Sequence, residues 1–280
     1  MKKIFITLFI FFVLIFLVPH DVFAVVSTQK DTIKILLVPG HDDEIWGSQY
    51  GNLKEADMNL VLATKIYNIL KKDKRFKVYI TRDVLGYTTE FTNYFSFHQP
   101  EIISFEENAK KNMQDKINNG SFVKKIEVVH NKATEDVALR LYGINKWADE
   151  NKIDAVIHIH FNDYPRENTW AKGIYKGFTV YMPEEQMVNS KESTKLAKSI
   201  FSQISKKYIP STYEKELEGL TPDQSLIALG SNGTLLKSVK SVLIEYGYIY
   251  RFGNSLARHQ MYTNMANLTF SGLKNYFFGK

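Results

Sequence analysis

The sequence contains no cysteine in its 280 residues, so no disulfide can stabilise the fold, and the size of the core must do so instead. It has no dense block of lysine and arginine and no alternation of basic with aromatic residues, which argues against a nucleic-acid-binding protein. The longest apolar run, residues 4–18, is shorter than the roughly 20 residues with which a helix crosses a membrane.

The first 24 residues nevertheless have the layout of a secretory signal. Lys2 and Lys3 precede the apolar run, and the sequence Val-Phe-Ala at 22–24 offers small residues for cleavage. We therefore expect residues 1–24 to be removed as a signal peptide, with an uncleaved anchor as the alternative. The protein is then secreted and works in the cell wall or the periplasm.

The rest of the chain, residues 25–280, is long enough for one large α/β domain. The net charge of the whole sequence, +6, comes mainly from lysines spread along it. Outside a cell, such diffuse charge suits an anionic surface of wall polymers or phospholipid headgroups, and it is equally typical of a merely solvated surface. After signal cleavage we expect neither a membrane span nor a nucleic-acid partner.

A strand, a helix and a second strand follow one another at the start of this domain. Residues 32–38 form a nearly continuous apolar run that ends at Pro39-Gly40, which predicts a buried strand. Residues 53–72 carry apolar side chains at helical spacing, and residues 77–81 predict the next strand. This order is typical of a parallel βαβ unit.

The alternation continues to the end of the chain. Further strands are predicted at 155–159, 177–182 and 239–244, and further helices at 137–148, 190–207 and 255–277. We therefore expect an α/β fold, a single three-layer domain over residues 30–280 with a mostly parallel twisted sheet flanked by helices. The spacing does not give the order of the strands or their direction at the edges.

One segment interrupts this rhythm. Residues 85–132 contain an aromatic stretch, then a part rich in lysine and asparagine, and a possible strand at 125–129. We interpret the segment as an insertion in the domain. The sequence has no repeat of fixed period and no linker rich in glycine, serine or proline, so a tethered wall-binding module is not indicated.

Three side chains predict a catalytic metal site at the carboxyl edge of the sheet. His41 follows the first buried strand and its turn, Glu55 lies in the first turn of the next helix, and His160 ends a later strand. Two imidazoles and one carboxylate are a ligand set that leaves the fourth position of zinc open for water. Taken singly, each residue also has a structural interpretation, Glu55 for example as a carboxylate favoured by the helix dipole.

Other polar residues leave alternatives open. His158 points to the same face of its strand as His160 and could replace it as a ligand, although His160 is nearer the strand end. Glu245 follows a buried strand and precedes a glycine turn, which suits a general base and equally a structural ion pair. Arg82 and Arg140 show the same ambiguity, because arginines at such places are usually ion-pair partners.

Taken together, the segments resemble the zinc-dependent N-acetylmuramoyl-L-alanine amidases, the third amidase family of peptidoglycan hydrolases. The resemblance lies in LLVPGH at 36–41, KEADMNL at 54–60, IHIHFN at 157–162 and VLIEYGYI at 242–249, in the order of the family, with ITRD at 80–83 and LRLYGINKWAD at 139–149 in support. It covers roughly residues 33–83 and 135–275.

The resemblance implies a zinc ion on His41, Glu55 and His160, a catalytic carboxylate at Glu245, and peptidoglycan as the substrate. Asp42-Asp43 depart from the glycines that the family usually has, and residues 85–132 are longer than its usual connection. Two other functions stay open: a different zinc amidohydrolase or carboxypeptidase acting on wall peptides, and a non-catalytic or autoinhibited wall-binding relative.

Overall fold

The structure is a computed structural model that describes residues 32–279, apart from residues 43, 126 and 127. The predicted signal peptide at 1–24 lies outside the described residues. Within the part of the chain that is described, no helix combines the length and the apolarity that a membrane crossing requires.

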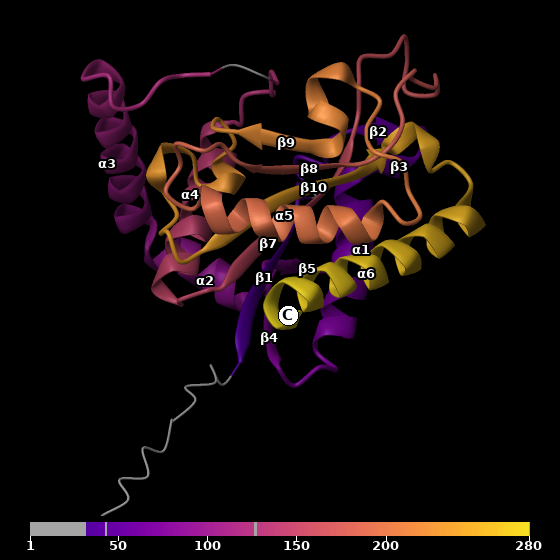
Figure 1. Cartoon of the computed structure of the whole chain (residues 1–280), viewed down its shortest axis with the longest axis horizontal. Coiled ribbons are helices and arrows are strands. Elements are labelled where there is room, and N and C mark those ends of the chain that lie inside the picture. The colour runs from indigo at the N-terminus through magenta and orange to yellow at the C-terminus, as the bar shows by residue number, and fades with distance from the viewer. Residues whose placement is uncertain (1–31, 43, 126–127, 280) are drawn as a thin grey trace, which may run out of the picture. The chain divides into compact units, whose positions relative to one another are not determined.

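A six-stranded sheet forms the middle layer (Figure 1). In spatial order its strands are β4 (Phe76–Ile80), β1 (Ile33–Pro39), β7 (Ala155–Asn162), β10 (Lys240–Tyr248), β8 (Thr179–Pro183) and β9 (Leu220–Asp223). The first four strands are parallel to one another, β8 is antiparallel to β10, and β9 is parallel to β8. The mostly parallel sheet is therefore confirmed, and the carboxyl ends of four strands meet at one edge.

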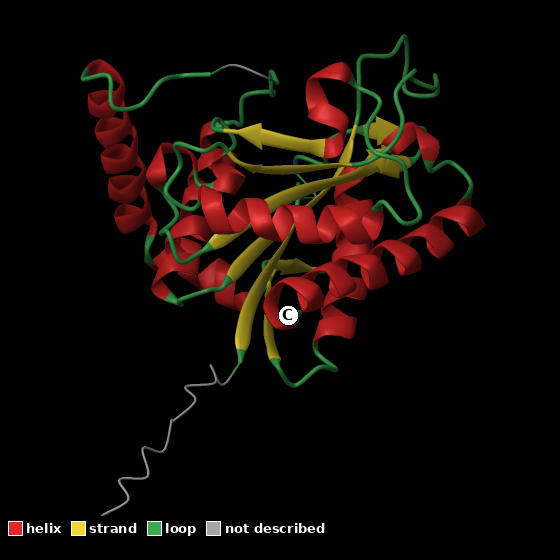
Figure 2. Cartoon of the chain, viewed as in Figure 1, coloured by secondary structure: helices red, strands yellow, loops and turns green. Residues whose placement is uncertain are grey.

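Helices cover both faces of the sheet, which confirms the three-layer α/β fold (Figure 2). One face packs against α1 (Glu55–Leu70), α5 (Ser190–Ile204) and α6 (Ser255–Phe278), and the other against α2 (Thr89–Phe97), α3 (Gln99–Asn118) and α4 (Glu135–Glu150). Successive side chains of β1 alternate between the two cores: Ile35 and Leu37 belong to the first, Leu36 and Val38 to the second.

Shorter elements complete the chain. They are the hairpin β2 (Gln49–Tyr50) with β3 (Leu53–Lys54), the hairpin β5 (Arg82–Asp83) with β6 (Gly86–Tyr87), and the 3-10 turns η1 (Glu214–Gly219), η2 (Ile227–Leu229), η3 (Ser231–Gly233) and η4 (Ile249–Arg251). The edge strand β9 was not predicted, because its Pro222 reads as a strand breaker. Proline is tolerated there because an edge strand leaves one side of its backbone unpaired.

The segment 85–132 contains two helices that the sequence did not predict, α2 and α3. The helix α2 is rich in aromatic and β-branched residues, which have low helix propensity, and it is held by packing instead. Phe91 is fully buried with its ring 4.8 Å from that of Trp147 on α4, and Ile102 of α3 is 1% exposed. Of the possible strand at 125–129, residues 126 and 127 lie outside the described part, and their described neighbours form no strand.

Candidate metal centre and acid–base site

The three predicted ligands meet at the carboxyl edge of the sheet. His41 follows the end of β1, His160 lies near the end of β7, and Glu55 is the first residue of α1. The Oε1 atom of Glu55 lies 3.3 Å from Nε2 of His41 and 3.0 Å from Nδ1 of His160. One donor atom from each residue lies within 4.8 Å of the others. The structure thus brings together side chains that are up to 119 positions apart in sequence, from His41 to His160.

Two glycines make room for this cluster. A Cβ atom on Gly40 would stand 2.1 Å from the ring of His160, and one on Gly47 would stand 2.5 Å from the ring of His41 and 2.6 Å from the carboxylate of Glu55. Gly47 also has a φ of +73°, a conformation that residues with a side chain rarely adopt. The backbone at both positions can lie against the ligands only because no side chain is present.

Further hydrogen bonds fix the carboxylate of Glu55. Ser48 donates from its backbone N–H and its hydroxyl to Oε2 at 2.9 and 2.8 Å, and the backbone N–H of Phe161 donates to Oε1 at 3.3 Å. Asn59, one turn along α1, donates to the carbonyl of Gly40 at 2.9 Å. The helix start and the turn after β1 are therefore tied together, which holds the cluster in shape.

The electrostatics of the cluster favour an ionised carboxylate. Burial opposes the charge on Glu55, but hydrogen bonds with His160 and His41 outweigh burial and hold the pKa of Glu55 well below its usual value. Burial works against the protonated form of His41 as well, yet Glu55 raises the pKa of that imidazole. Burial dominates at His160 and lowers its pKa, which favours the neutral imidazole that a metal requires.

The donor set fits a zinc ion. Bonds of about 2.0–2.2 Å in tetrahedral geometry separate neighbouring ligand atoms by about 3.3 Å. The two distances from Oε1 of Glu55, 3.3 Å to Nε2 of His41 and 3.0 Å to Nδ1 of His160, are close to that value. Two nitrogen donors and one carboxylate oxygen also match the chemistry of a catalytic zinc site, in which a fourth position is left for a reactant.

Glu245 on β10 is the register partner of His160 on β7, so both side chains leave the sheet on the same face. Its Oε2 atom is buried and has no hydrogen-bond partner among the described residues. Burial, followed by the charges of Glu55 and Glu216, raises the pKa of Glu245 well above its usual value. A carboxyl group with these properties binds a proton more readily than one in water, which suits a general acid–base residue.

Glu216 was missed by the sequence analysis. This residue of η1 is 1% exposed, and its carboxylate accepts hydrogen bonds from Asn162 on β7 at 2.5 Å, Tyr181 on β8 at 3.0 Å and Tyr248 on β10 at 3.1 Å. Three neighbouring strands are thus joined beside Glu245. In sequence, Glu216 stands in an ordinary charged stretch, KELE, and no local pattern marks it as buried.

The remaining candidates, His158, Arg82 and Arg140, lie outside the cluster. His158 is 1% exposed and is not part of the cluster, and burial followed by the charge of His160 lowers its pKa to about 3. Arg82 donates to the backbone carbonyls of Pro39, Gly40 and Ala56, so it braces the turn that carries His41. Arg140 on α4 forms an ion pair with Asp42 at 2.8 Å, in line with the ion-pair interpretation.

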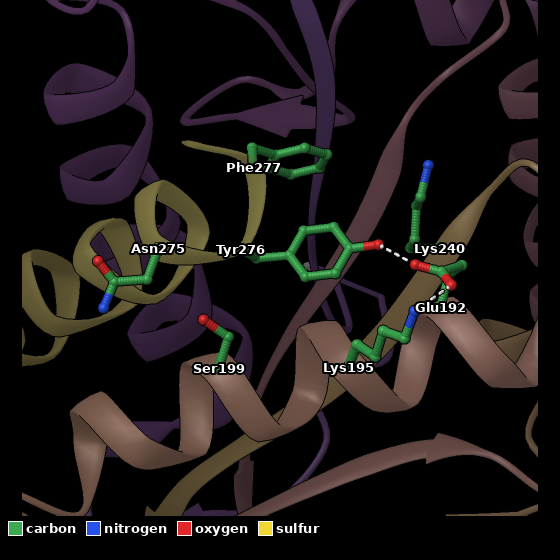
Figure 3. A pocket seen from close by; sticks show the side chains of 7 residues that line it. All are labelled: Glu192, Lys195, Ser199, Lys240, Asn275, Tyr276 and Phe277. Carbon is green, nitrogen blue, oxygen red and sulfur yellow. Dashed lines mark hydrogen bonds and ion pairs between the residues drawn. The ribbon is translucent and has the colours of Figure 1, made fainter. Parts of the chain in front are cut away.

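A separate open pocket of about 600 Å³ lies between α5 and the end of α6 (Figure 3). It is lined by Glu192, Lys195, Ser199, Lys240, Asn275, Tyr276 and Phe277. Lys240 is the first residue of β10, so this pocket lies at the amino edge, opposite the cluster. Its carboxylate, Glu192, is already engaged by Lys195 and Tyr276, which makes it an unsuitable place for the reaction.

A three-layer α/β fold with two imidazoles and a carboxylate at the carboxyl edge, and a second carboxylate beside them, is typical of metal-assisted hydrolases. The model of one protein family, described as N-acetylmuramoyl-L-alanine amidase, matches residues 100–275. This chain belongs to that family, whose members are hydrolases of peptidoglycan. The matched range includes His160 and Glu245, while His41 and Glu55 precede it.

Solved structures of such amidases share the fold. The CwlD amidase of Clostridioides difficile, solved with the GerS lipoprotein, is 18% identical with a TM-score of 0.56, and the alignment covers 88% of this chain and 98% of that one. The catalytic domain of CwlV from Bacillus (Paenibacillus) polymyxa var. colistinus is 15% identical with a TM-score of 0.53, covering 89% and 100%. An amidase from Clostridium difficile 630 is 16% identical with a TM-score of 0.52, covering 89% and 99%. A comparison with curated protein sequences gave no match.

Proposed function

We propose that this chain is a zinc-dependent amidase that hydrolyses the amide between N-acetylmuramic acid and L-alanine in peptidoglycan. One observation carries the proposal: His41, Glu55 and His160 converge on one point of the sheet edge where Glu245 stands buried without a partner. Membership of the amidase family supports the choice of the scissile bond.

In this proposal His41, Glu55 and His160 hold the zinc ion. A zinc ion bound there would supply a Lewis acid that polarises the amide carbonyl and lowers the pKa of water from about 15.7 towards 7. Glu245 accepts a proton from the attacking water on its carboxylate. As the C–N bond breaks, Glu245 passes that proton to the nitrogen of L-alanine, so the products are a carboxylic acid and a free amine.

The surroundings of Glu245 support this role. A carboxylate in water is a weak base at neutral pH because its pKa is about 4.3. Burial and the nearby charges of Glu55 and Glu216 raise the pKa of Glu245, so this carboxylate binds the proton more strongly than a carboxylate in water does. The bound proton is then available to the leaving amine, which needs it before the C–N bond can break.

The organisation of the chain forms part of the same proposal. Residues 1–24 direct the protein out of the cytoplasm, residues 30–280 form the amidase domain, and residues 85–132 are an insertion within it. The protein acts on the cell wall or in the periplasm, where its positive net charge of +6 suits contact with anionic wall polymers.

Analysis of the reaction products tests the proposed bond. Purified peptidoglycan is incubated with the zinc-loaded protein, and the released fragments are identified by mass spectrometry. We expect stem peptides with a free amino group on L-alanine, no release after treatment with a chelator, and recovery when zinc is returned. Shortened stem peptides that stay attached to the glycan would indicate a carboxypeptidase instead, and no release from zinc-loaded protein would indicate a non-catalytic relative.

A further inference from the structure

We propose that Trp46 and Trp170, on either side of the β2–β3 hairpin, form a stacking surface for the glycan strand of the substrate. The inference rests on the proposed function for the identity of the substrate, and it adds a binding site beside the metal cluster. Both indoles are exposed, Trp46 at 39% and Trp170 at 66%, although burial of such a side chain is normally favourable. Tryptophan contributes a large contact area and is enriched at interfaces.

The hairpin connects the two indoles to the cluster. It ends at Lys54, and the next residue is the predicted ligand Glu55. Trp46 immediately precedes Gly47, whose backbone lies against His41 and Glu55. The loop that carries Trp170 begins after Asn162, two residues beyond His160. Trp46 is therefore next to the residue that lies against the cluster, and Trp170 packs on the hairpin that leads into Glu55.

The loop around Trp170 is fixed by the side chain of Arg166. Its guanidinium forms an ion pair with Asp163 at 2.7 Å and donates to the carbonyl of Gln49 on β2, also at 2.7 Å. It also donates to three carbonyls of the Trp170 turn, those of residues 168, 169 and 171, at 3.1–3.2 Å. These contacts hold the loop of Trp170 in place before any ligand binds. Less conformational entropy is therefore lost on binding.

One face of Trp170 rests on the tip of the hairpin. A Cβ atom on Gly51 would stand 2.4 Å from the indole, so the close approach requires glycine at this position. The backbone N–H of Gly51 donates to the carbonyl of Thr169 at 2.9 Å, which joins the hairpin to the loop. The ring of Tyr50 lies 6.4 Å away from that of Trp170. One face of the indole is thus supported, and the large exposed fraction of the side chain remains available.

Trp46 is held at the base of the same hairpin. The ammonium group of Lys54 lies 4.0 Å from the centre of its ring, a cation–π contact. Its backbone carbonyl accepts a hydrogen bond from Ala56 in the first turn of α1 at 3.0 Å. Trp170 packs on Gly51 at the tip of the hairpin, and Trp46 lies against Lys54 at its base, so the two indoles contact different positions of the same hairpin.

The chemistry of the glycan matches such a surface. The face of a pyranose ring carries C–H groups, which pack on the negative face of an aromatic ring. In the substrate, the lactyl group that bears the scissile amide branches from the glycan itself. A glycan strand on the hairpin would therefore bring its branch point to the cluster, and the stem peptide would leave in another direction.

Tryptophan fluorescence tests this inference directly. The chain has three tryptophans, and the third, Trp147, is only 3% exposed, so binding at the surface is reported by the other two. The Glu245→Gln protein, which prevents turnover, is titrated with peptide-free oligosaccharides of alternating N-acetylglucosamine and N-acetylmuramic acid, and in parallel with the free stem peptide. We expect the oligosaccharide to shift the emission and the stem peptide to leave it unchanged.

Variants in the same background locate the binding. Trp46→Ala and Trp170→Ala should each weaken oligosaccharide binding by about tenfold, and Trp170→Phe should restore most of it because a flat ring remains. Phe97→Ala, at an aromatic residue of α2 that is 74% exposed, is the control and should bind like the parent protein. Calorimetry measures the affinity of all variants, including the one that lacks both indoles.

Two results would overturn the inference: a response to the stem peptide alone, or unchanged oligosaccharide affinity in the variant without both indoles. The outcome is separate from that of the proposed function. A protein that binds the glycan but releases no peptide after zinc loading keeps the stacking surface and loses the amidase mechanism. A protein that releases peptide but does not bind the glycan at the indoles supports the amidase mechanism and contradicts the stacking surface.

Discussion

Glu245 at the carboxyl edge of the central sheet contrasts with two aspartates at the amino edge. At the amino edge, Asp154 accepts a hydrogen bond from the backbone of Lys34 at 2.9 Å, and Asp149 accepts one from the backbone of Leu236 at 3.0 Å. At the carboxyl edge, Glu245 keeps a buried oxygen without any hydrogen-bond partner in the described structure. The same sheet thus has carboxylates bonded to its own backbone at one edge and an unsatisfied one at the other.

The difference distinguishes carboxylates that are bonded within the fold from a carboxylate that is available for a reaction. A buried polar group that lacks a partner costs free energy, so proteins usually avoid it unless the group has another use. Here the unsatisfied carboxylate stands beside the cluster of His41, Glu55 and His160, where a substrate would provide the missing partner. Changing Glu245 should therefore affect activity, and changing Asp149 at the amino edge should affect stability.

The largest effect is expected from removing a ligand. His160→Ala should abolish zinc binding and reduce peptide release by about a thousandfold or more, because the metal contributes several kcal/mol of transition-state stabilisation. Metal content is measured by mass spectrometry of the purified protein. The matched control is His158→Ala, which removes a buried imidazole on the same strand and should keep the zinc. Equal metal loss in both variants would contradict the assignment of the ligands.

Glu245→Gln should come next. The amide cannot carry the proton, so we expect turnover to fall by about 10²–10⁴, with zinc content unchanged. The free energy of unfolding should not fall, since the substitution removes a buried carboxyl group that lacks a hydrogen bond. Turnover on purified peptidoglycan and urea unfolding give the two values. Near-normal turnover would remove Glu245 from the mechanism.

Glu216→Gln should affect stability more than chemistry. An amide keeps one acceptor oxygen and replaces the other by an NH2 group, so Asn162, Tyr181 and Tyr248 can no longer all donate to this side chain as they do to the carboxylate. We expect the free energy of unfolding to fall by about 1–3 kcal/mol. Because Glu216 does not reach the reacting atoms in the mechanism, turnover should fall less than in Glu245→Gln. A larger loss of turnover than that would place Glu216 in the reaction itself.

Asp149→Asn at the amino edge should give a gain in stability. Burial raises the pKa of Asp149 to about 6, above the value of about 3.9 in an unfolded chain. The folded protein therefore binds the proton more tightly, and Asp149 lowers the unfolding free energy as the pH rises from about 4 to about 6. Asparagine keeps the acceptor for Leu236 without the charge, so we expect about 1–3 kcal/mol more stability at pH 8 and no gain at pH 4.

Urea unfolding at the two pH values measures this effect, and peptide release should not change. A loss of activity in Asp149→Asn would break the proposed division between the two edges. Asp149→Asn and Glu245→Gln form a pair of variants, because both change a carboxyl group to an amide, one at each edge of the sheet.

The sequence was informative wherever local pattern and tertiary structure agree. Apolar runs and helical spacing predicted the four parallel strands and the helices α1, α4, α5 and α6, because these elements bury the apolar cores on the two faces of the sheet. The strand-turn-histidine pattern also placed His41 and His160 at the same edge, since the carboxyl ends of parallel strands lie together. The structure then shows these two histidines beside Glu55.

The sequence failed where tertiary packing overrides local preference. The helix α2 consists mainly of residues with low helix propensity, and its packing in the core beside Trp147 holds its conformation. The burial of Glu216 depends on hydrogen-bond donors from three strands, and these donors are up to 86 positions apart in sequence, from Asn162 to Tyr248. No window of neighbouring residues contains that information, so such a carboxylate can be recognised only from the folded chain.

The packing of α2 and α3 restricts their movement. Phe91 and Ile102 share one apolar core with Trp147 of α4, so a swing of these two helices would expose that core to water. Such a movement would cost nearly as much as local unfolding. The two helices are therefore a fixed part of the domain, although they belong to the segment that interrupts its alternation of strands and helices.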